Sequence, residues 1–161
     1  MDLVQFAPFF LFLHVMGAIL AFGPTFAYSI AGAMGGAEPQ HANFSLRVGE
    51  ATGKRLVYPL AVLQGITGLA LIAIGNIPLF STPWLLVGIT LYVIALVYAL
   101  TVQRNAVHHA IELTSAPPPA GAPAGPPPEL MATVQKIQRG GMFLGLLIVI
   151  IVFLMVVKPG A

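Results

Sequence analysis

The chain alternates between long apolar runs and short polar segments. Residues 3–37, 56–103 and 140–157 contain no Asp, Glu, Lys or Arg, and the second of these runs is interrupted by the helix-start sequence STPW at residues 81–84. A transmembrane helix needs about 20 consecutive apolar residues. The pattern therefore predicts an all-α, four-transmembrane-helix up-down bundle, with spans over residues 6–33, 56–74, 84–102 and 141–157.

The polar segments predict how these spans are joined. Residues 45–55 and 104–113 carry enough polar positions to extend the second and third helices into water. Residues 117–128, with the sequence PPPAGAPAGPPP, are too rich in proline for a helix and predict an extended linker. We therefore expect a single membrane domain over residues 1–161.

Composition narrows the class of protein further. Apolar residues make up 58% of the chain and charged residues 7%, whereas a soluble domain carries roughly a quarter charged residues. The lipid bilayer is thus the expected partner. The formal charge of +2 is explained by basic residues beside membrane spans, so no nucleic-acid partner is expected. The absence of cysteine excludes disulfides and thiolate metal sites.

The basic residues also predict an orientation. All but one lie in the first and third connections, which the positive-inside rule places in the cytoplasm. Both termini are then expected outside. The residues concerned are Arg47, Lys54, Arg55, Arg104, Lys136 and Arg139, with Lys158 alone on the other side.

One histidine lies well inside a predicted span. His14 is at the depth of Gln64, Thr67 and Tyr92 when depth is counted at about 1.5 Å per helical residue. Polar groups at that depth turn toward protein or a cavity. These four residues are therefore expected to form a buried polar cluster, either as a binding site or as a scaffold that satisfies its own hydrogen bonds.

Small residues recur at four-residue spacing on three spans, and they let helices approach closely in lipid. We expect these positions to pack helices within the bundle, with contact to another subunit as the alternative. They are Gly23, Ala27, Ala31 and Gly35 on the first span, Ala61 and Gly65 on the second, and Gly141 and Gly145 on the fourth.

Catalytic and metal sites are not expected. His108 and Glu112 share a helix face at i, i+4 spacing, but two ligands do not make a metal site. No acid, lysine or arginine lies at bilayer depth, so the carboxylates of proton-coupled transporters are missing. No Ser-His-Asp pattern is apparent either, and enzyme activity is not expected without a cofactor.

Two stretches carry a family resemblance. LHVMGAILAFGPTF at residues 13–26 and YPLAVLQGITGLAL at residues 58–71 resemble a family of bacterial four-helix membrane proteins of unknown function, which implies the inner membrane of a bacterial cell. The first stretch is also similar, more remotely, to the copper-resistance protein D family and to membrane-embedded haem-binding protoporphyrinogen oxidases. The oxidase resemblance implies that His14 ligates haem b.

The sequence therefore leaves two functional hypotheses. The favoured hypothesis is a non-catalytic membrane protein, an accessory or structural subunit of a larger complex that packs against other subunits or itself and holds no cofactor. The alternative is a haem or porphyrin protein with His14 as axial ligand and a redox role. A bound chromophore distinguishes them.

Overall fold

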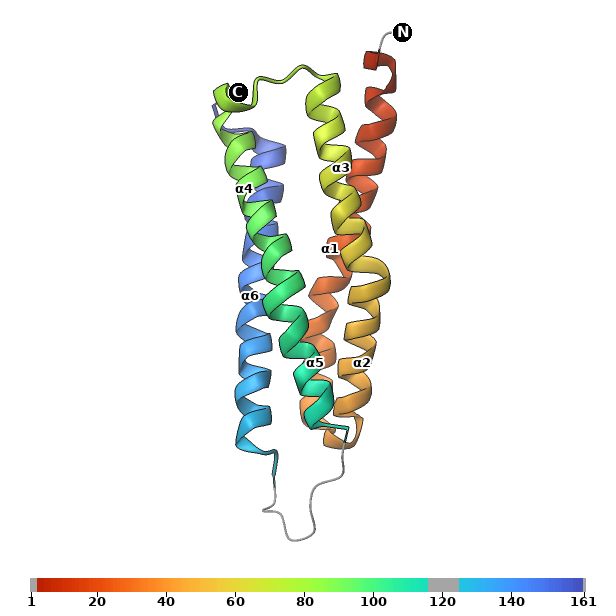
Figure 1. Ribbon diagram of the computed structural model, residues 1–161, viewed down its shortest axis with the longest axis vertical. Coiled ribbons are helices and arrows are strands. Elements are labelled where there is room, and N and C mark those ends of the chain that lie inside the picture. Colours follow the sequence, from red (N-terminus) through yellow and green to blue (C-terminus); the bar gives the residue numbers. More distant parts are fainter. Residues whose placement is uncertain (1–2, 116–124, 161) are drawn as a thin grey trace.

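The computed structural model describes residues 3–115 and 125–160, and these form an elongated bundle of four long helices (Figure 1). The first is α1 (Ala7–Ala37), preceded by the short 3₁₀ helix η1 (Leu3–Phe6). The second joins α2 (Ala42–Thr52), the π-helical segment η3 (Gly53–Val57) and α3 (Tyr58–Ile74). The third joins α4 (Pro83–Tyr98), the π-helical η5 (Ala99–Gln103) and α5 (Arg104–Leu113), and the fourth is α6 (Pro128–Val157). Short 3₁₀ turns, η2 (Pro39–His41) and η4 (Leu79–Ser81), lie in the first two connections.

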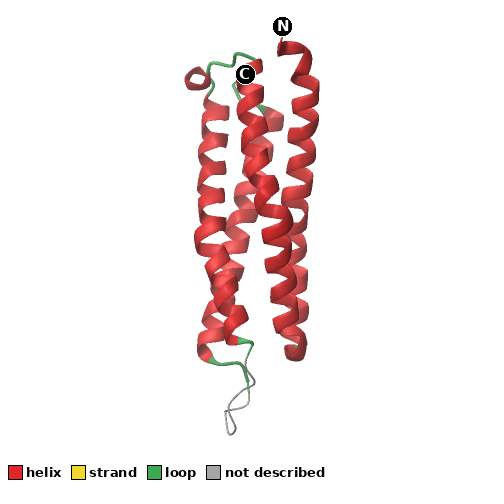
Figure 2. Cartoon of the chain, turned by 45° about the vertical axis from the view of Figure 1, so that its right-hand side comes forward, coloured by secondary structure: helices red, strands yellow, loops and turns green. Residues whose placement is uncertain are grey.

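The predicted fold class is confirmed. Four helices are long and apolar enough to cross a membrane, and all regular structure in the described residues is helical (Figure 2). The predicted helical extensions at residues 45–55 and 104–113 are confirmed as parts of α2, η3 and α5. Most of the predicted linker at 117–128 lies outside the described residues, and its last proline, Pro128, begins α6.

A proline explains the first π-helical segment. Pro59 has no N–H, and its ring crowds the carbonyl four residues earlier, at Arg55. The Tyr58 N–H instead donates to the Gly53 carbonyl, five residues back. Local π turns of this kind satisfy backbone groups that a proline frees inside a membrane helix. The second long helix therefore continues through Pro59 without a break.

The helices pack as two pairs. The second long helix, α2 to α3, lies along α1, while α4, η5 and α5 lie along α6 (Figure 1). Both chain ends and the turn at residues 75–82 lie at one end of the bundle. Small side chains dominate the contacts, because helices approach closely only where side chains are short. The buried apolar residues include Ala21, Ala61, Ala106 and Ala110.

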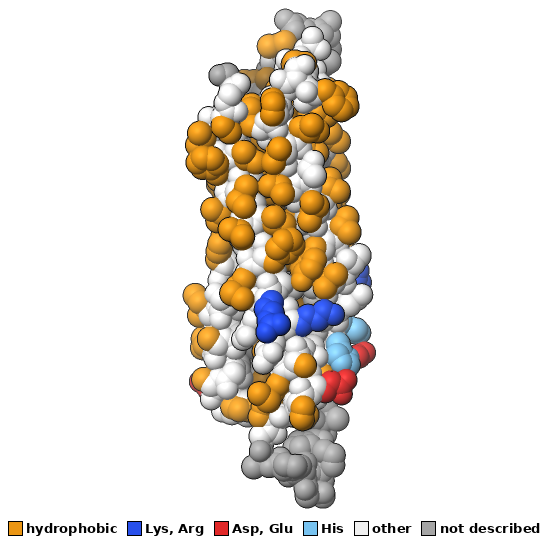
Figure 3. All heavy atoms as spheres, turned by 90° about the vertical axis from the view of Figure 1, so that its left-hand side faces the viewer, with side chains coloured by type: hydrophobic (Ala, Val, Ile, Leu, Met, Phe, Trp, Pro, Cys, Tyr) orange, Lys and Arg blue, Asp and Glu red, His pale blue; other side chains and the backbone are white. Residues whose placement is uncertain are grey.

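The outer surface is apolar over most of its length. Large side chains such as Phe12, Ile66 and Leu69 are each more than half exposed. Figure 3 shows apolar side chains over the upper part of one face, then a band of basic side chains, with histidine and acidic side chains below it. A surface of this kind is suited to lipid rather than water.

Candidate functional site

The buried polar residues of the upper bundle gather around His14. Its Nδ1 lies 3.0 Å from Thr67 Oγ1, and its Nε2 lies 3.0 Å from the side-chain nitrogen of Gln64. Gln64 and Thr67 are 8% and 2% exposed. α1 supplies the imidazole and α3 supplies both partners, so the cluster ties the first span to the second.

Hydrogen-bond directions follow from the single proton of Thr67. Its hydroxyl lies 2.9 Å from the Leu63 carbonyl of its own helix, to which it donates, and its oxygen is then free to accept from the His14 Nδ1–H. The other nitrogen, Nε2, accepts from the Gln64 amide N–H. The imidazole is therefore neutral, and both of its nitrogens are used by protein groups.

Two glycines make room for this cluster. A Cβ at Gly68 would lie 3.1 Å from His14 Cε1, and a Cβ at Gly17 would lie 2.9 Å from Gln64 Oε1. Side chains at either position would push His14 or Gln64 out of place. Sequence reasoning missed both glycines, although Gly17 shares a helix face with His14 at i, i+3 spacing.

Tyr92 lies beside the cluster rather than in it. Its hydroxyl donates to the Ala61 carbonyl at 2.7 Å, about one helical turn from Gln64. Gly65 makes this approach feasible, because a Cβ there would lie 2.6 Å from the Tyr92 hydroxyl. The structure thus brings together three of the four predicted residues, while Tyr92 ties α4 to α3.

The cluster does not present a ligand to iron in this arrangement. An axial histidine uses one bare ring nitrogen for the metal while the other nitrogen bonds a protein group. Here the Gln64 amide occupies His14 Nε2 and Thr67 occupies Nδ1. Haem at His14 would therefore require Gln64 to release the ring.

A second polar contact joins the third and fourth long helices. The Gln103 amide donates to the Ile137 carbonyl at 3.0 Å, beside the Tyr98 ring, which packs edge-on against Phe143. Gly140 is buried against this pair, and a Cβ there would lie 2.9 Å from the Tyr98 hydroxyl and closer still to Gln103 Oε1. Gly140 is the glycine of α6 that allows the close approach.

The predicted small-residue positions divide into two sets. Ala61 and Gly65 lie against Tyr92, and the Ser45 hydroxyl donates to the Ala31 carbonyl at 2.8 Å beside Gly35. The other positions face outward: Gly23, Ala27 and Gly141 are exposed, and a Cβ at Gly23, Gly141 or Gly145 would meet nothing within 4 Å.

The expectation that Gly141 and Gly145 pack within this bundle therefore needs correction. Each residue advances an α-helix by about 100°, so turning Gly140 toward the third long helix turns Gly141 away from it. The sequence contains the adjacent pair Gly140–Gly141, and the four-residue spacing to Gly145 selected the outward-facing member. The same outward placement holds for Gly23.

Ion pairs link the helices at the other end of the bundle. Glu50 Oε1 lies 2.7 Å from Lys54 Nζ and 3.3 Å from His108 Nδ1. The hydrogen bond from Lys54 holds the pKa of Glu50 below its usual value, and the bond from His108 acts in the same direction. His108 also lies 3.4 Å from Glu112. His108 thus joins Glu50 and Glu112 in one ion-pair network, and no group of three or more His, Asp or Glu side chains in the described part of the chain has the arrangement of a metal site.

These contacts fix the relative heights of the basic residues. His108 of α5 faces Glu50 of α2 on an antiparallel helix. Arg104 lies one helical turn before His108, and Lys54 lies one turn after Glu50. Because the helices are antiparallel, Arg104 and Lys54 are therefore at the same height.

The contact of Gln103 with Ile137 extends this alignment to α6. Counted along the helix axes, this contact puts Lys136 level with Arg104. Five basic residues then lie within about 5 Å of one height, at the rise of about 1.5 Å per residue. We call them the basic belt: Lys54, Arg55, Arg104, Lys136 and Arg139.

The basic belt marks one end of the uncharged part of the second, third and fourth long helices, whereas the uncharged run of α1 continues past it to Ala37. From Arg55 to the end of α3 at Ile74 the second helix carries no further charge, and this length of helix rises about 29 Å. A bilayer's hydrocarbon core is about 30 Å thick. The apolar part between the belt and the 75–82 turn therefore matches one bilayer, and His14, opposite Gln64, lies near its middle.

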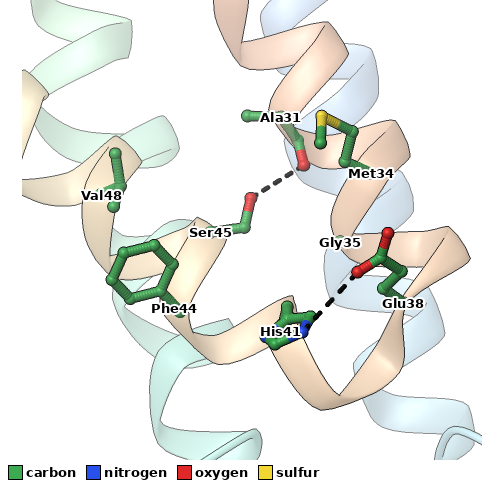
Figure 4. Close-up of a pocket in the computed structure, with 8 residues that line it drawn as sticks. All are labelled: Ala31, Met34, Gly35, Glu38, His41, Phe44, Ser45 and Val48. Carbon is green, nitrogen blue, oxygen red and sulfur yellow. Dashed lines mark hydrogen bonds and ion pairs between the residues drawn. The ribbon is translucent and has the colours of Figure 1, made fainter.

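The helices continue past the belt for several turns and enclose a groove there. It lies between the end of α1 and the start of α2, with a volume of about 370 Å³. Phe44, Val48 and Met34 line it, the Ser45–Ala31 hydrogen bond crosses it, and the His41–Glu38 pair closes one end (Figure 4). The groove lies away from His14, about 15 Å beyond the belt at Phe44.

Comparison with known proteins identifies a family. The model of a family described as predicted integral membrane proteins (DUF2269) matches residues 9–159. No curated protein and no solved structure matches the chain.

Proposed function

The chain belongs to this family of predicted integral membrane proteins, and we propose that it is a non-catalytic accessory subunit of a larger assembly. We place it in the inner membrane of a bacterial cell, with both termini outside. The orientation rests on the basic belt, because lysine and arginine concentrate on the cytoplasmic side of membrane proteins.

The observation that carries the proposal is the apolar groove beyond the belt. Phe44 is 68% exposed and Met34 is 61% exposed, at a height where the bundle has left the hydrocarbon core. Lipid covers exposed apolar side chains above the belt, but water would meet these. Contiguous apolar surface facing water marks a protein contact. The groove suits an apolar helix face of another subunit that also extends past the headgroups.

The His14 cluster supports the non-catalytic part of the proposal. His14 is the one histidine at bilayer depth, and its two nitrogens are bonded to Thr67 and Gln64. A neutral, fully bonded imidazole holds α1 in register with α3 and leaves no free nitrogen for a substrate or a proton carrier. Its proposed role is structural.

Site-specific photocrosslinking in intact cells tests the accessory role. A photoreactive residue at Phe44 is expected to form a defined adduct with one other membrane protein. The control is Phe80, which is 88% exposed at the opposite end of the bundle and should give no such adduct. The proposal is wrong if Phe44 gives no protein adduct, or the same adducts as Phe80.

An absorption spectrum of the detergent-purified protein separates the proposal from its alternative. An accessory subunit shows no Soret band. A Soret band in the wild type that disappears in His14→Phe would replace the proposal with a haem protein in which Gln64 has released the imidazole.

A further inference from the structure

The basic belt has a chemistry of its own. We propose that it is a binding site for the phosphate groups of anionic phospholipids, held in the headgroup layer around three of the four long helices. This inference does not depend on the accessory role, because it concerns lipid on the outside of the bundle and not a protein in the groove.

Most of the belt lacks an internal counter-charge. Among the described residues Lys54 pairs with Glu50 at 2.7 Å, whereas Arg55, Arg104, Lys136 and Arg139 form no ion pair with a described carboxylate. All five side chains are exposed. Cations that neither pair nor enter the bundle are available to an external anion.

The nearby carboxylates lie below the belt, and Lys54 is the one belt residue that pairs with any of them among the described residues. Glu50 is bonded to Lys54 and His108. Glu129 lies 3.1 Å from His109, and Glu112 lies 3.6 Å from the same ring. Figure 3 shows this order on one face, with basic side chains in a band next to the apolar surface and acidic side chains further from it. The local positive charge therefore faces the membrane edge.

Position and chemistry together select a lipid phosphate. The belt lies at one end of an apolar length of about 29 Å, where the headgroups of a bilayer with a hydrocarbon core of about 30 Å would begin. Three of the five cations are arginines, whose planar guanidinium binds phosphate through paired hydrogen bonds. Juxtamembrane basic clusters of this kind attract anionic lipids.

A track for acyl chains begins directly above one of the arginines. Met142 and Leu146 follow Arg139 at i+3 and i+7 on α6, so the three share one helix face. Met142 is 68% exposed and Leu146 is 59% exposed, and Gly141 beside them leaves the surface open. A phospholipid can therefore place its phosphate on Arg139 and an acyl chain along this face. Free phosphate would use the first contact alone.

Thermal melting of the purified full chain in detergent tests the site. Added phosphatidylglycerol should raise the melting temperature of the wild type by about 3 °C or more, whereas phosphatidylcholine and inorganic phosphate should not. The shift should shrink at high salt, because exposed charges are screened. This salt dependence is measured on the wild type, and an unchanged shift of the melting temperature in 1 M NaCl would overturn the proposal.

A charge-neutralised variant locates the effect. Arg104→Gln with Arg139→Gln should lose most of the phosphatidylglycerol shift, while Lys158→Gln, at the other end of the bundle, should keep it. Melting without added lipid shows whether the double variant folds. If it does not fold, Lys136→Gln takes its place and is expected to lose part of the phosphatidylglycerol shift. The belt is not the site if the belt variants keep the full shift, or if phosphatidylcholine or inorganic phosphate matches phosphatidylglycerol in the wild type.

Discussion

Adjacent glycines on α6 offer a sharp test of the packing. A Cβ at Gly140 would lie 2.9 Å from the Tyr98 hydroxyl and would also overlap Gln103 Oε1, whereas a Cβ at Gly141 would meet nothing within 4 Å. Gly140→Ala and Gly141→Ala add the same methyl group to the same helix, one residue apart. Their difference therefore isolates the contact with the third long helix.

The expected difference follows from three contributions. Overpacking at Gly140 costs about 1–3 kcal/mol. Displacing Gln103 also loses its hydrogen bond to Ile137, a further 0.5–1.5 kcal/mol or so. Replacing glycine by alanine in a helix returns roughly 1 kcal/mol at either position. Gly140→Ala should thus be destabilised by about 0.5–3.5 kcal/mol, while Gly141→Ala should be stabilised by up to roughly 1 kcal/mol.

The free energy of unfolding in detergent micelles, from denaturant titration followed by circular dichroism, measures both variants. Equal stabilities would show that Gly140 does not face Gln103 and Tyr98. A greater loss in Gly141→Ala would place α6 in a different rotation and refute the alignment that defines the basic belt.

Three further predictions follow from other contacts. His14→Phe should lower the free energy of unfolding by about 1–3 kcal/mol, because the buried Gln64 amide loses its acceptor; Val15→Phe, at a residue 49% exposed, is the matched control, and an equal loss in both would contradict the cluster. The lowered pKa of Glu50 means that its bond to Lys54 stabilises the fold above the unfolded pKa of about 4.3 and is lost as pH falls through the folded pKa. The melting temperature of the wild type should therefore drop on acidification more than that of Glu50→Gln, and identical pH profiles would remove this role. A lone cysteine at Ser115 should stay unlabelled by an impermeant reagent added outside intact cells, while one at Phe80 should react; the reverse result would invert the proposed orientation.

The fold was predictable because the charges are so few. Three uncharged runs and the STPW sequence indicated four helices long and apolar enough to cross a membrane, and a polar pattern without proline indicated the helical extensions. Counting helical rise also placed His14 at the depth of Gln64 and Thr67, which the structure joins by hydrogen bonds. The depth of a residue can be counted from the start of its span, and the uncharged runs show where each span starts.

Features that depend on helix rotation were not predictable in the same way. Almost every face of these helices is apolar, so periodicity does not tell the lipid-facing side from the packed side, and Gly141 was chosen over Gly140. Tyr92 had the right depth, but its hydroxyl meets Ala61 rather than the cluster. The π-helical segment η5 has no proline after it to mark its position.

The groove at Phe44 was missed for another reason. It forms where the end of α1 meets α2 after the 3₁₀ turn at Pro39–His41, and its residues read as ordinary positions of a first span and a polar extension. The proposal that this apolar surface lies outside the hydrocarbon core depends on the height of the basic belt, which comes from contacts between helices.

We expect the bilayer to cover the bundle between the basic belt and the 75–82 turn and to leave the lower part of α1, α2, α5 and α6 in water. Nitroxide labels on single cysteines test it in reconstituted vesicles, and the chain has no native cysteine to remove. Labels at Ile66 and Leu69 should be accessible to oxygen and shielded from a water-soluble nickel chelate, whereas labels at Phe44 and Val48 should be accessible to the chelate. If labels at Phe44 and Val48 are shielded from nickel as fully as those at Ile66 and Leu69, the bilayer extends past the belt, and the groove does not face water.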